Sequence, residues 1–207
     1  MPRNYVSNKD ESARLFKSEF LEKFTHVHPL VPVAVFVPVI VYLLFRASEV
    51  LRPRETAALF VSGVLTWTLA EYLLHRFVFH HQPSSAWGKK LHFLMHGVHH
   101  DYPNDSLRLV MPPAVSIPLA LAFYALFTAL MGPDPVWAFF PGFLAGYLCY
   151  DLIHYATHHF GMKGRVALAL KQHHMRHHYQ DPGANYGVSS PVWDFVFGTY
   201  QKKKREE

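Results

Sequence analysis

The chain has 207 residues, half of them hydrophobic, and only 17% of them are charged. An average soluble protein carries about 25% charged residues, so the composition indicates a single membrane domain rather than a soluble one. The formal net charge is +5, but the only strong basic run is Lys202 to Arg205. Basic residues dispersed in this way suit membrane-flanking positions better than a nucleic-acid surface. Cys149 is the single cysteine, which excludes a disulfide framework and a cysteine-rich metal site.

Residues 1–29 are polar and charged and lack the short apolar run of a cleavable signal peptide. Their larger apolar residues nevertheless recur at roughly helical spacing: Leu15, Phe16, Phe20, Leu21 and Phe24. This pattern predicts an amphipathic helix that either lies on the membrane surface or packs against the rest of the protein. We therefore expect a cytosolic N-terminal arm over 1–29 and a membrane domain over 30–207.

Four apolar segments follow, at 30–45, 57–74, 109–131 and 136–150, and the last can continue as a helix to His158. Each is close to the roughly 17 to 25 residues that cross the hydrocarbon core of a bilayer. The run Gly132-Pro133-Asp134-Pro135 predicts a tight turn between the last two segments. The sequence thus predicts an all-α fold, a membrane bundle of four helices in two hairpins.

Basic residues predict the orientation of this bundle. With four spans, residues 1–29, 75–108 and the tail after 153 share one side and carry five, four and eight lysines and arginines. The opposite side has only Arg46, Arg52 and Arg54. By the positive-inside rule the heavily basic side is cytosolic, in either the endoplasmic reticulum or a bacterial inner membrane. The clustered histidines all belong to that side.

Histidine is the most informative residue type in the chain. Fourteen of the 16 histidines form four tight groups: His75, His80 and His81; His92, His96, His99 and His100; His154, His158 and His159; His173, His174, His177 and His178. Spacings of three and four residues recur, and residues so spaced share one face of a helix. Each group can therefore present two or three imidazoles to one point. Imidazole is the commonest protein ligand for metals and suits iron, zinc and copper, so the pattern predicts two metals sharing the set.

Five residues separate His75 from His80, a rotation of about 140° on a straight α-helix. The helix is therefore expected to end or bulge between them. His26 and His28 lie outside the pattern and are interpreted as ordinary residues. Four more histidines adjoin the motif positions and are either ligands or structural residues: His81, His92, His159 and His173.

A metal-bound imidazole usually donates its second ring N–H to a carboxylate or carbonyl oxygen. Carboxylates that are close in sequence to the histidines are candidates for this role: Glu71, Asp101, Asp105 and Asp151. Asp101 and Asp105 flank Pro103-Asn104, so turn formation is an equal alternative for both. Glu71 lies inside a span, where a carboxylate without a partner is costly, which favours a functional role.

Four histidine motifs occur in a fixed order. They are His75-Arg-Phe-Val-Phe-His80; His92-Phe-Leu-Met-His96-Gly-Val-His99-His100-Asp-Tyr-Pro-Asn-Asp105; Tyr150-Asp151-x-x-His154-x-x-x-His158-His159; and His174-Met-Arg-His177-His178-Tyr179, with Tyr186-Gly-Val-Ser-Ser-Pro-x-Trp193-Asp194-x-x-Phe197-Gly-Thr199 behind the last. Over about residues 57–200 the chain resembles the membrane fatty acid 2-hydroxylases of the fatty acid hydroxylase/sterol desaturase superfamily.

The resemblance implies a dinuclear centre in a helical cap at the cytosolic ends of a four-helix membrane bundle. It implies two iron ions in the active protein, with zinc able to replace them in the isolated protein, and ten metal ligands: His75, His80, His96, His99, His100, His154, His158, His174, His177 and His178. The implied reaction inserts one oxygen atom of the co-substrate dioxygen at carbon 2 of a fatty acyl or sphingolipid-type chain. No catalytic side chain beyond the metal centre is implied.

Many eukaryotic relatives carry a haem domain marked by a His-Pro-Gly-Gly signature, which this sequence lacks. The resemblance therefore implies that a separate electron-transfer protein supplies the electrons, beside the lipid partners of the membrane. Aromatic residues near the final motif are candidates for the mouth of the substrate site, with anchoring at the membrane interface as the alternative: Tyr179, Tyr186 and Trp193.

Other functions stay open at this point. Desaturases, carotenoid ring hydroxylases and sterol-modifying oxidases use similar histidine motifs and the same oxidant, although the tail that begins at Gly187 favours an acyl hydroxylase. A membrane metal transporter would also be rich in histidine. Transporters, however, tend to place their ligands near the middle of the membrane at broken helices, whereas these histidines lie at the ends of spans and beyond.

Overall fold

The computed structural model describes residues 5–202, and these residues form helices and no strands. Four helical stretches are long and apolar enough to cross a membrane: Leu30–Val50, Pro53–Phe79, Pro113–Met131 and Pro133–His159. They correspond to α2 (Leu30–Val50), α3 (Pro53–Leu73) with the π-helix η1 (Leu74–Phe79), α6 (Pro113–Met131) and α7 (Pro133–His159). The prediction of an all-α bundle with four membrane helices is confirmed.

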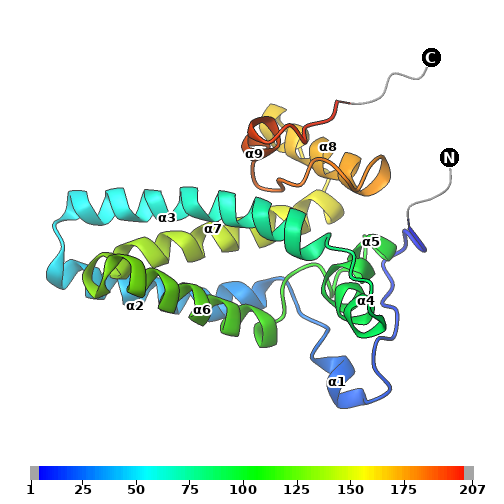
Figure 1. The fold of residues 1–207 in the computed structure, drawn as a ribbon, viewed down its shortest axis with the longest axis horizontal. Helices are drawn as coiled ribbons and strands as arrows, with labels where there is room; N and C mark the ends of the chain where they lie inside the picture. The colour runs from blue at the N-terminus through cyan, green and yellow to red at the C-terminus, as the bar shows by residue number, and fades with distance from the viewer. Residues whose placement is uncertain (1–4, 203–207) are drawn as a thin grey trace.

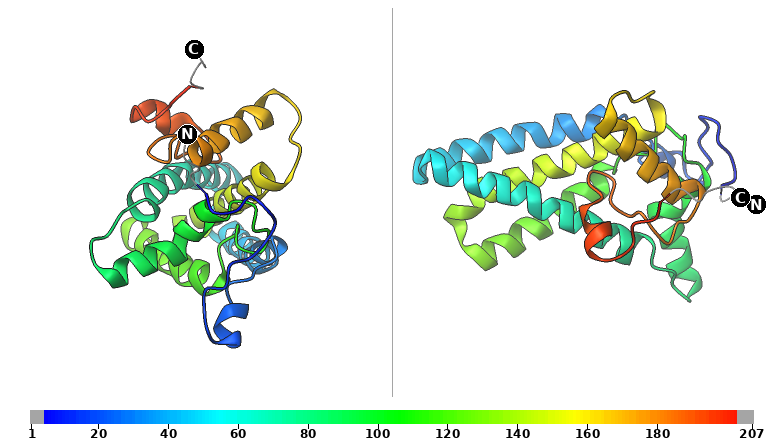
Figure 2. Two further views of the ribbon diagram at one scale, coloured as in Figure 1. Left: turned by 90° about the vertical axis from the view of Figure 1, so that its right-hand side faces the viewer. Right: turned by 90° about the horizontal axis from the view of Figure 1, so that it is seen from above.

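The two hairpin turns lie together at one end of this bundle, and the remaining elements gather at the other end (Figure 1). Gly132, with a φ of 85°, joins α6 to α7 directly, because glycine adopts such angles without strain. The turn is confirmed at Gly132 but is shorter than predicted, because Pro133, Asp134 and Pro135 form the first turn of α7. Figure 2 (left) looks at the bundle from the opposite end, where a cap lies in front of the long helices.

The helix boundaries differ from the apolar segments at several ends. The second span begins at Pro53 instead of residue 57, and the fourth begins at Pro133 instead of residue 136. The third span begins at Pro113 instead of residue 109, because a proline is favoured in the first turn of a helix and keeps the preceding residue extended. The first span continues to Val50 and the fourth to His159. In the fourth span, the polar residues beyond Tyr150 extend α7 out of the apolar region and into the cap.

Helix α7 is the centre of the bundle. In its most apolar window 72% of the residues are buried, against 11–22% in the other three membrane helices. Gly142 and Gly146 stand one turn apart on α7 and face α3; a Cβ atom on Gly142 would lie 1.9 Å from the carbonyl oxygen of Phe60. Small residues at this spacing let two membrane helices approach closely. The close contact sets the histidine-bearing ends of α3 and α7 next to each other.

The predicted irregularity between His75 and His80 is confirmed. The α-helical part of this span ends at Leu73, and residues Leu74–Phe79 form a π-helix before His80 ends it. A π-helical turn holds more residues than an α-helical turn and changes the direction of the side chains that follow. His75 and His80 consequently face the same point.

The cap is built from short helices and the loop that follows α8. Its elements are α4 (Ala86–His92), the π-helix η2 (Phe93–Gly97), α5 (Val98–Asp101), α8 (Arg165–Tyr179) and α9 (Val192–Val196). Trp193 on α9 donates a hydrogen bond to the Thr68 hydroxyl on α3, at 3.0 Å. This contact fastens the last helix of the cap to a membrane helix.

The N-terminal arm packs against the loop that joins α5 to α6. The backbone N–H of Val27 donates to the carbonyl of Leu107 at 2.7 Å, and the Ser12 hydroxyl donates to Asp105 at 2.7 Å. Its helix, α1 (Glu19–Lys23), is shorter than the predicted amphipathic helix because Leu15 and Phe16 lie before it in an irregular segment. The arm therefore covers one side of the cap.

Candidate metal centre

Ten histidines lie together where α3, α7 and the cap meet. Group 1 consists of His75, His80, His96, His100 and His177, and group 2 of His99, His154, His158, His174 and His178. Within each group the five ring nitrogens that face inward all lie within 4.8 Å of one another. The structure thus brings together all ten histidines named from the sequence, in two sets of five.

The two membrane-helix motifs each stay in one set, His75 with His80 in group 1 and His154 with His158 in group 2, but each cap motif is divided between the two groups. His96 and His100 belong to group 1, whereas His99 between them belongs to group 2. Residues four apart on a helix differ by about 40° in direction, but neighbouring residues differ by about 100°. Adjacent histidines such as His99 and His100 therefore point to different centres.

The same division occurs on α8, with the two groups exchanged. His174 and His178 contribute to group 2, and His177 contributes to group 1. Each group therefore receives two histidines from the end of a membrane helix. The cap supplies the other three from two helical stretches, η2 with α5 and α8: an i, i+4 pair from one stretch and a single histidine from the other. The two cap helices are shared by both groups, and the rings of His100 and His178 stack between them with centroids 4.3 Å apart.

The spacing of the ring nitrogens fits a metal ion in group 1. Nε2 of His96 lies 3.1 Å from the Nε2 atoms of His75 and His80 and 3.0 Å from that of His100. A neutral ring nitrogen donates or accepts a single proton, so hydrogen bonding does not account for three such neighbours. Ligands held at about 2.1 Å from a metal and at right angles lie about 3.0 Å apart. The donor set therefore suits a cation.

Group 2 has the same close spacing. Nε2 of His99 lies 2.9 Å from that of His154, and Nε2 of His158 lies 2.9 Å from that of His174. The imidazole-only composition of both groups suits iron, zinc or copper more than magnesium or calcium, which prefer oxygen ligands.

Backbone carbonyls set the protonation of two rings in group 1. Nδ1–H of His75 donates to the carbonyl of Tyr186 at 2.5 Å, and Nδ1–H of His177 donates to the carbonyl of Ala184 at 2.7 Å. A carbonyl only accepts, so the proton is on Nδ1 and the lone pair on Nε2 faces the group. Asn185, between the two carbonyls, has a φ of 57°, a conformation that asparagine adopts more readily than most residues.

In group 2 the outer nitrogens have a different environment. The Nδ1 atoms of all five rings are buried and have no hydrogen-bond partner among residues 5–202: His99, His154, His158, His174 and His178. The two groups thus have equal numbers of histidines but unequal support from the surrounding protein.

Burial keeps the cap histidines neutral. Burial first, and then the neighbouring His75 and His92 rings, lower the pKa of His100 to about 3. Burial also lowers the pKa of His174 and of His177 well below the usual value, and nearby histidines add to the effect. Neutral imidazole is the form that binds a metal, so the rings are ready to do so at physiological pH.

None of the four predicted carboxylates bonds to a ring of either group. Glu71 accepts from the backbone N–H groups of Val188 and Ser189, at 2.6 and 2.8 Å, because the buried carboxylate needs donors and this loop supplies them. The Asp105 carboxylate accepts hydrogen bonds from the Ser12 hydroxyl and from the Leu107 N–H. The bond to Leu107, two residues along the chain, is typical of a turn, so Asp105 has the turn-forming role that was the alternative in the sequence.

The other two carboxylates also lie apart from the rings. The backbone carbonyl of Asp101 accepts from the N–H groups of Val6 and Ser7, and no hydrogen bond of its carboxylate is found among the described residues. Asp151 lies in the wall of a cavity, one helical turn before His154.

Asp194 accepts a hydrogen bond from His173, although it was not among the carboxylates predicted for such a role. It accepts from Nε2–H of His173 at 3.0 Å and from the N–H groups of Tyr186 and Gly187 at 2.8 Å. Burial raises its pKa, but the hydrogen bonds from His173 and Thr199 outweigh burial and hold it below the usual value. Its position as the one carboxylate in the otherwise apolar run Val192–Val196 could have indicated a buried, hydrogen-bonded role.

The other histidines lie outside both groups. His173 has the structural role just described, and His159 stacks on Tyr155 with ring centroids 4.6 Å apart. His26 contacts Arg108, with Nε2 2.9 Å from Nη2, and His28 accepts from the Leu30 N–H. His81 and His92 belong to neither group of five.

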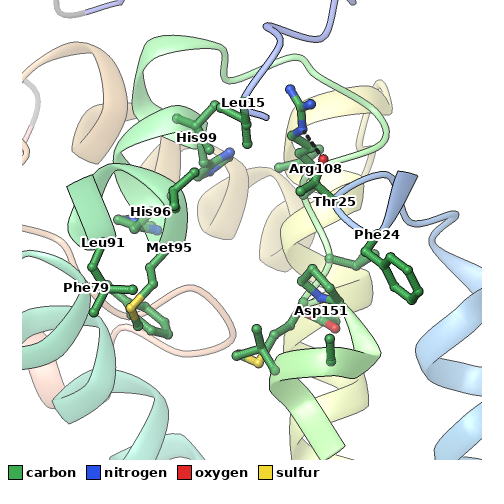
Figure 3. A pocket seen from close by; sticks show the side chains of 18 of the residues that line it. Leu15, Phe24, Thr25, Phe79, Leu91, Met95, His96, His99, Arg108 and Asp151 are labelled. Atoms are coloured by element: carbon green, nitrogen blue, oxygen red, sulfur yellow. Dashed lines mark hydrogen bonds between the residues drawn. The ribbon is translucent and has the colours of Figure 1, made fainter. Parts of the chain in front are cut away.

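A cavity of about 330 Å³ leads to the histidines (Figure 3). Most of its wall is apolar, and it combines arm residues such as Leu15 and Phe24 with Met95 from η2 and Leu109 from the following loop. Histidines of both groups also line it: His96 of group 1, and His99 and His154 of group 2. An apolar cavity with few polar groups is the usual form of a small-molecule site.

The three aromatic residues predicted for the substrate mouth are not among the residues that line this cavity, and their role at the mouth stays a prediction. Tyr186 packs against the ring of His75 at 5.7 Å between centroids and carries the carbonyl that His75 uses. Trp193 fastens α9 to α3, and Tyr179 donates to Asn8 of the arm. Trp193 thus connects the cap to a membrane helix, and Tyr179 connects it to the arm. No local sequence pattern indicated that the arm would complete the cavity.

Residues 60–199 match the family model described as fatty acid hydroxylase. A dihydroceramide fatty acyl 2-hydroxylase of Arabidopsis thaliana is 40% identical over 91% of this chain and 80% of its own length. The fatty acid 2-hydroxylase of Mus musculus is 38% identical over 90% of this chain and 56% of its own length. The hydroxylase domain in a solved structure of full-length scs7p has 41% identity and a TM-score of 0.84, over 89% of this chain and 70% of that one. This chain is therefore an integral membrane oxidoreductase that belongs to the fatty acid hydroxylase family.

Proposed function

We propose that this protein inserts one oxygen atom of dioxygen at carbon 2 of a lipid acyl chain, with two iron ions held by groups 1 and 2. The main support for this proposal is the cavity, because it is mostly apolar and histidines of both groups line it. An acyl chain that enters it brings a C–H bond to the metal centre. The names of the relatives, which are fatty acyl 2-hydroxylases, support carbon 2 as the position.

All ten histidines of the two groups are the proposed ligands, five for each iron. When bound, iron supplies the activation of dioxygen and the removal of a hydrogen atom from carbon. Zinc is expected in their place after expression in a foreign host, because it ranks above ferrous iron in the usual affinity order. Zinc has no redox chemistry, so the zinc form would be inactive.

The side chains of the protein hold the substrate and exclude water. Five apolar residues line the cavity together with the histidines: Phe79, Leu94, Met95, Val110 and Val115. The C–H bond, dioxygen, two electrons and two protons yield an alcohol and water. We infer that a separate electron-transfer protein supplies the two electrons.

We further propose that the cap lies in the cytosol, on the side that the positive-inside rule predicts, in the endoplasmic reticulum or a bacterial inner membrane. The arm over residues 1–29 would then rest on the membrane surface. Phe20, Leu21 and Phe24 support this placement, since their side chains are 69%, 48% and 54% exposed. Exposed apolar residues of this kind insert into the headgroup region.

Lipid analysis of cells that express the protein with a suitable reductase tests the proposal. We expect 2-hydroxy acyl chains that contain oxygen from labelled dioxygen. Chains deuterated at both hydrogens of carbon 2 should lose one deuterium. New double bonds, hydroxylated carotenoids or oxidised sterols in place of 2-hydroxy acyl chains would contradict the proposal.

A further inference from the structure

Helix α9 of the cap turns an apolar face outward. Val192, Phe195 and Val196 are 54%, 60% and 61% exposed, and residues three and four apart share one face of a helix. Asp194, the one charged residue of α9, is fully buried on the opposite side. Exposed apolar faces mark contacts with a membrane or with another protein, so this face is expected to have a partner.

The surface of α3 next to α9 identifies the partner. One stripe runs along α3 through four residues at spacings of four, three and four: Val61, Leu65, Thr68 and Tyr72. Val61 and Leu65 are exposed, which suits side chains that contact lipid. Nearer the cap, Trp193 donates to the Thr68 hydroxyl, and the ring of Phe197 stacks on that of Tyr72 at 5.2 Å between centroids. Helix α9 and the residue after it therefore take the place of lipid along the cap end of this stripe.

This contact lies within the depth of the membrane. Figures 1 and 2 both show α9 beside the cap-end turns of α3. Thr68 precedes Leu74, the last residue of the apolar segment 57–74, by six residues, which is roughly 9 Å along a helix. Interfacial helices bury their apolar faces about 5–10 Å into the boundary between headgroups and acyl chains. The bond to Thr68 thus holds α9 at the depth of an interfacial helix.

We propose that α9 is an interfacial helix and that its outer face inserts into the lipid leaflet next to the cap. Membrane lipid is the occupant of this face, because the face adjoins the lipid-facing stripe of α3 and lies at membrane depth. The inference goes beyond the proposed reaction and does not depend on the substrate or the metal.

The inner side of α9 connects this membrane contact to the metal centre. Asp194 accepts from the backbone N–H groups of Tyr186 and Gly187, and the Tyr186 carbonyl accepts from His75 of group 1. Helix α9 is thus the element through which the bilayer contacts the loop behind group 1.

Fluorescence quenching by brominated lipid tests the insertion. The full chain is placed in phosphatidylcholine vesicles whose bromine atoms lie either high in the acyl chains or near their ends. Cys149 is replaced by alanine, and a fluorescent label is attached to a single new cysteine. The label of Val196→Cys should lose fluorescence in both lipids, and more in the lipid with bromine high in the chains, because an interfacial helix lies near the headgroups.

Two variants with matched exposure calibrate the result. Leu65→Cys, also 61% exposed, should be quenched more by bromine near the chain ends, because Leu65 lies roughly 14 Å along the helix from Leu74. Val6→Cys is 64% exposed at the start of the arm, and its backbone N–H bonds to the Asp101 carbonyl at the end of α5. Figure 1 shows this part of the cap on the side away from the bundle, so its label should respond to iodide in the water and to neither lipid.

Three results would overturn the inference. A Val196→Cys label that behaves like the Val6→Cys label would place α9 in water. A label protected from both bromine and iodide would assign the face to a protein surface, such as a second copy of the chain. Stronger quenching by bromine near the chain ends would place α9 too deep for an interfacial helix. Val192→Cys, one turn earlier on the same face, repeats the measurement should Val196→Cys fail to fold.

Discussion

Group 1 and group 2 take five histidines each from equivalent parts of the fold, but the protein supports them differently. Two rings of group 1 donate to the backbone carbonyls of Ala184 and Tyr186, and Asp194 holds the loop that carries these carbonyls. The Nδ1 atoms of group 2 have no such partners among the described residues. Outer hydrogen bonds orient ligands and strengthen metal binding, so group 1 should hold its metal more tightly.

The groups also differ in their relation to the cavity. Group 2 contributes His99 and His154 to the cavity wall, whereas group 1 contributes His96 alone. The more firmly supported group thus contributes one histidine to the cavity wall, and the less supported group contributes two. Substitutions at and around each group test whether the difference in hydrogen-bond support changes metal binding and activity.

Loss of a single histidine should have the largest effect. Alanine at His177 in group 1, or at His99 or His158 in group 2, removes a proposed ligand and should reduce 2-hydroxy product to background in expressing cells. His26→Ala and His28→Ala are the controls and should leave product nearly unchanged. Equal losses in both sets would mean that these histidines act through folding.

Disrupting the close packing of α3 against α7 should have the next largest effect, because this packing aligns the proposed ligands on the two membrane helices. In Gly142→Ala the new Cβ atom would meet the Phe60 carbonyl oxygen, so the helices must separate. Overpacking of this kind costs about 1 to 3 kcal/mol, which thermal unfolding in detergent would measure. Gly161→Ala is the matched control, since its Cβ atom would meet no atom within 4 Å; equal melting temperatures would refute the packing argument.

Removing the charge of Asp194 should lower the metal affinity of group 1 more than that of group 2. Asp194→Asn loosens the loop behind His75 and His177, and loss of such outer support lowers metal affinity by about 10-fold to 100-fold. Competition with a chelator should therefore show weaker binding at group 1 and little change at group 2. The exposed Asp134 provides a control as Asp134→Asn. A uniform loss at both groups would show that the loop supports the whole cap.

Acid should destabilise the metal-free protein. Buried cap histidines have a folded-state pKa below the unfolded value of about 6.5. Stability is therefore complete above that value and falls as the pH drops, by about 1.4 kcal/mol per pH unit for each ring that stays neutral in the fold. Thermal unfolding between pH 7 and pH 5, with and without zinc, would measure this, and an unchanged melting temperature of the metal-free protein would contradict it.

The sequence predicted the helices and the histidine clusters because both depend on local patterns, whereas the choice of ten ligands among the fourteen clustered histidines came from the family resemblance. Apolar runs of membrane length and spacings of three and four residues can be read along the chain. The division of adjacent residues such as His99 and His100 between two groups depends on helix directions, which local spacing does not reveal. Bonds from His75 and His177 to backbone carbonyls leave no trace in side-chain identity, and the contact of Ser12 with Asp105 joins residues 93 positions apart.

Metal content per chain is the most direct test of the central claim that two separate histidine groups each hold one ion. Elemental analysis should compare the wild-type protein with His75→Ala/His80→Ala, which removes the membrane-helix ligands of group 1, and with His154→Ala/His158→Ala, which does the same for group 2. We predict about two ions in the wild-type protein and about one in each double variant. Fewer than one ion per wild-type chain after reconstitution, or loss of both ions from folded protein in either variant, would contradict the account.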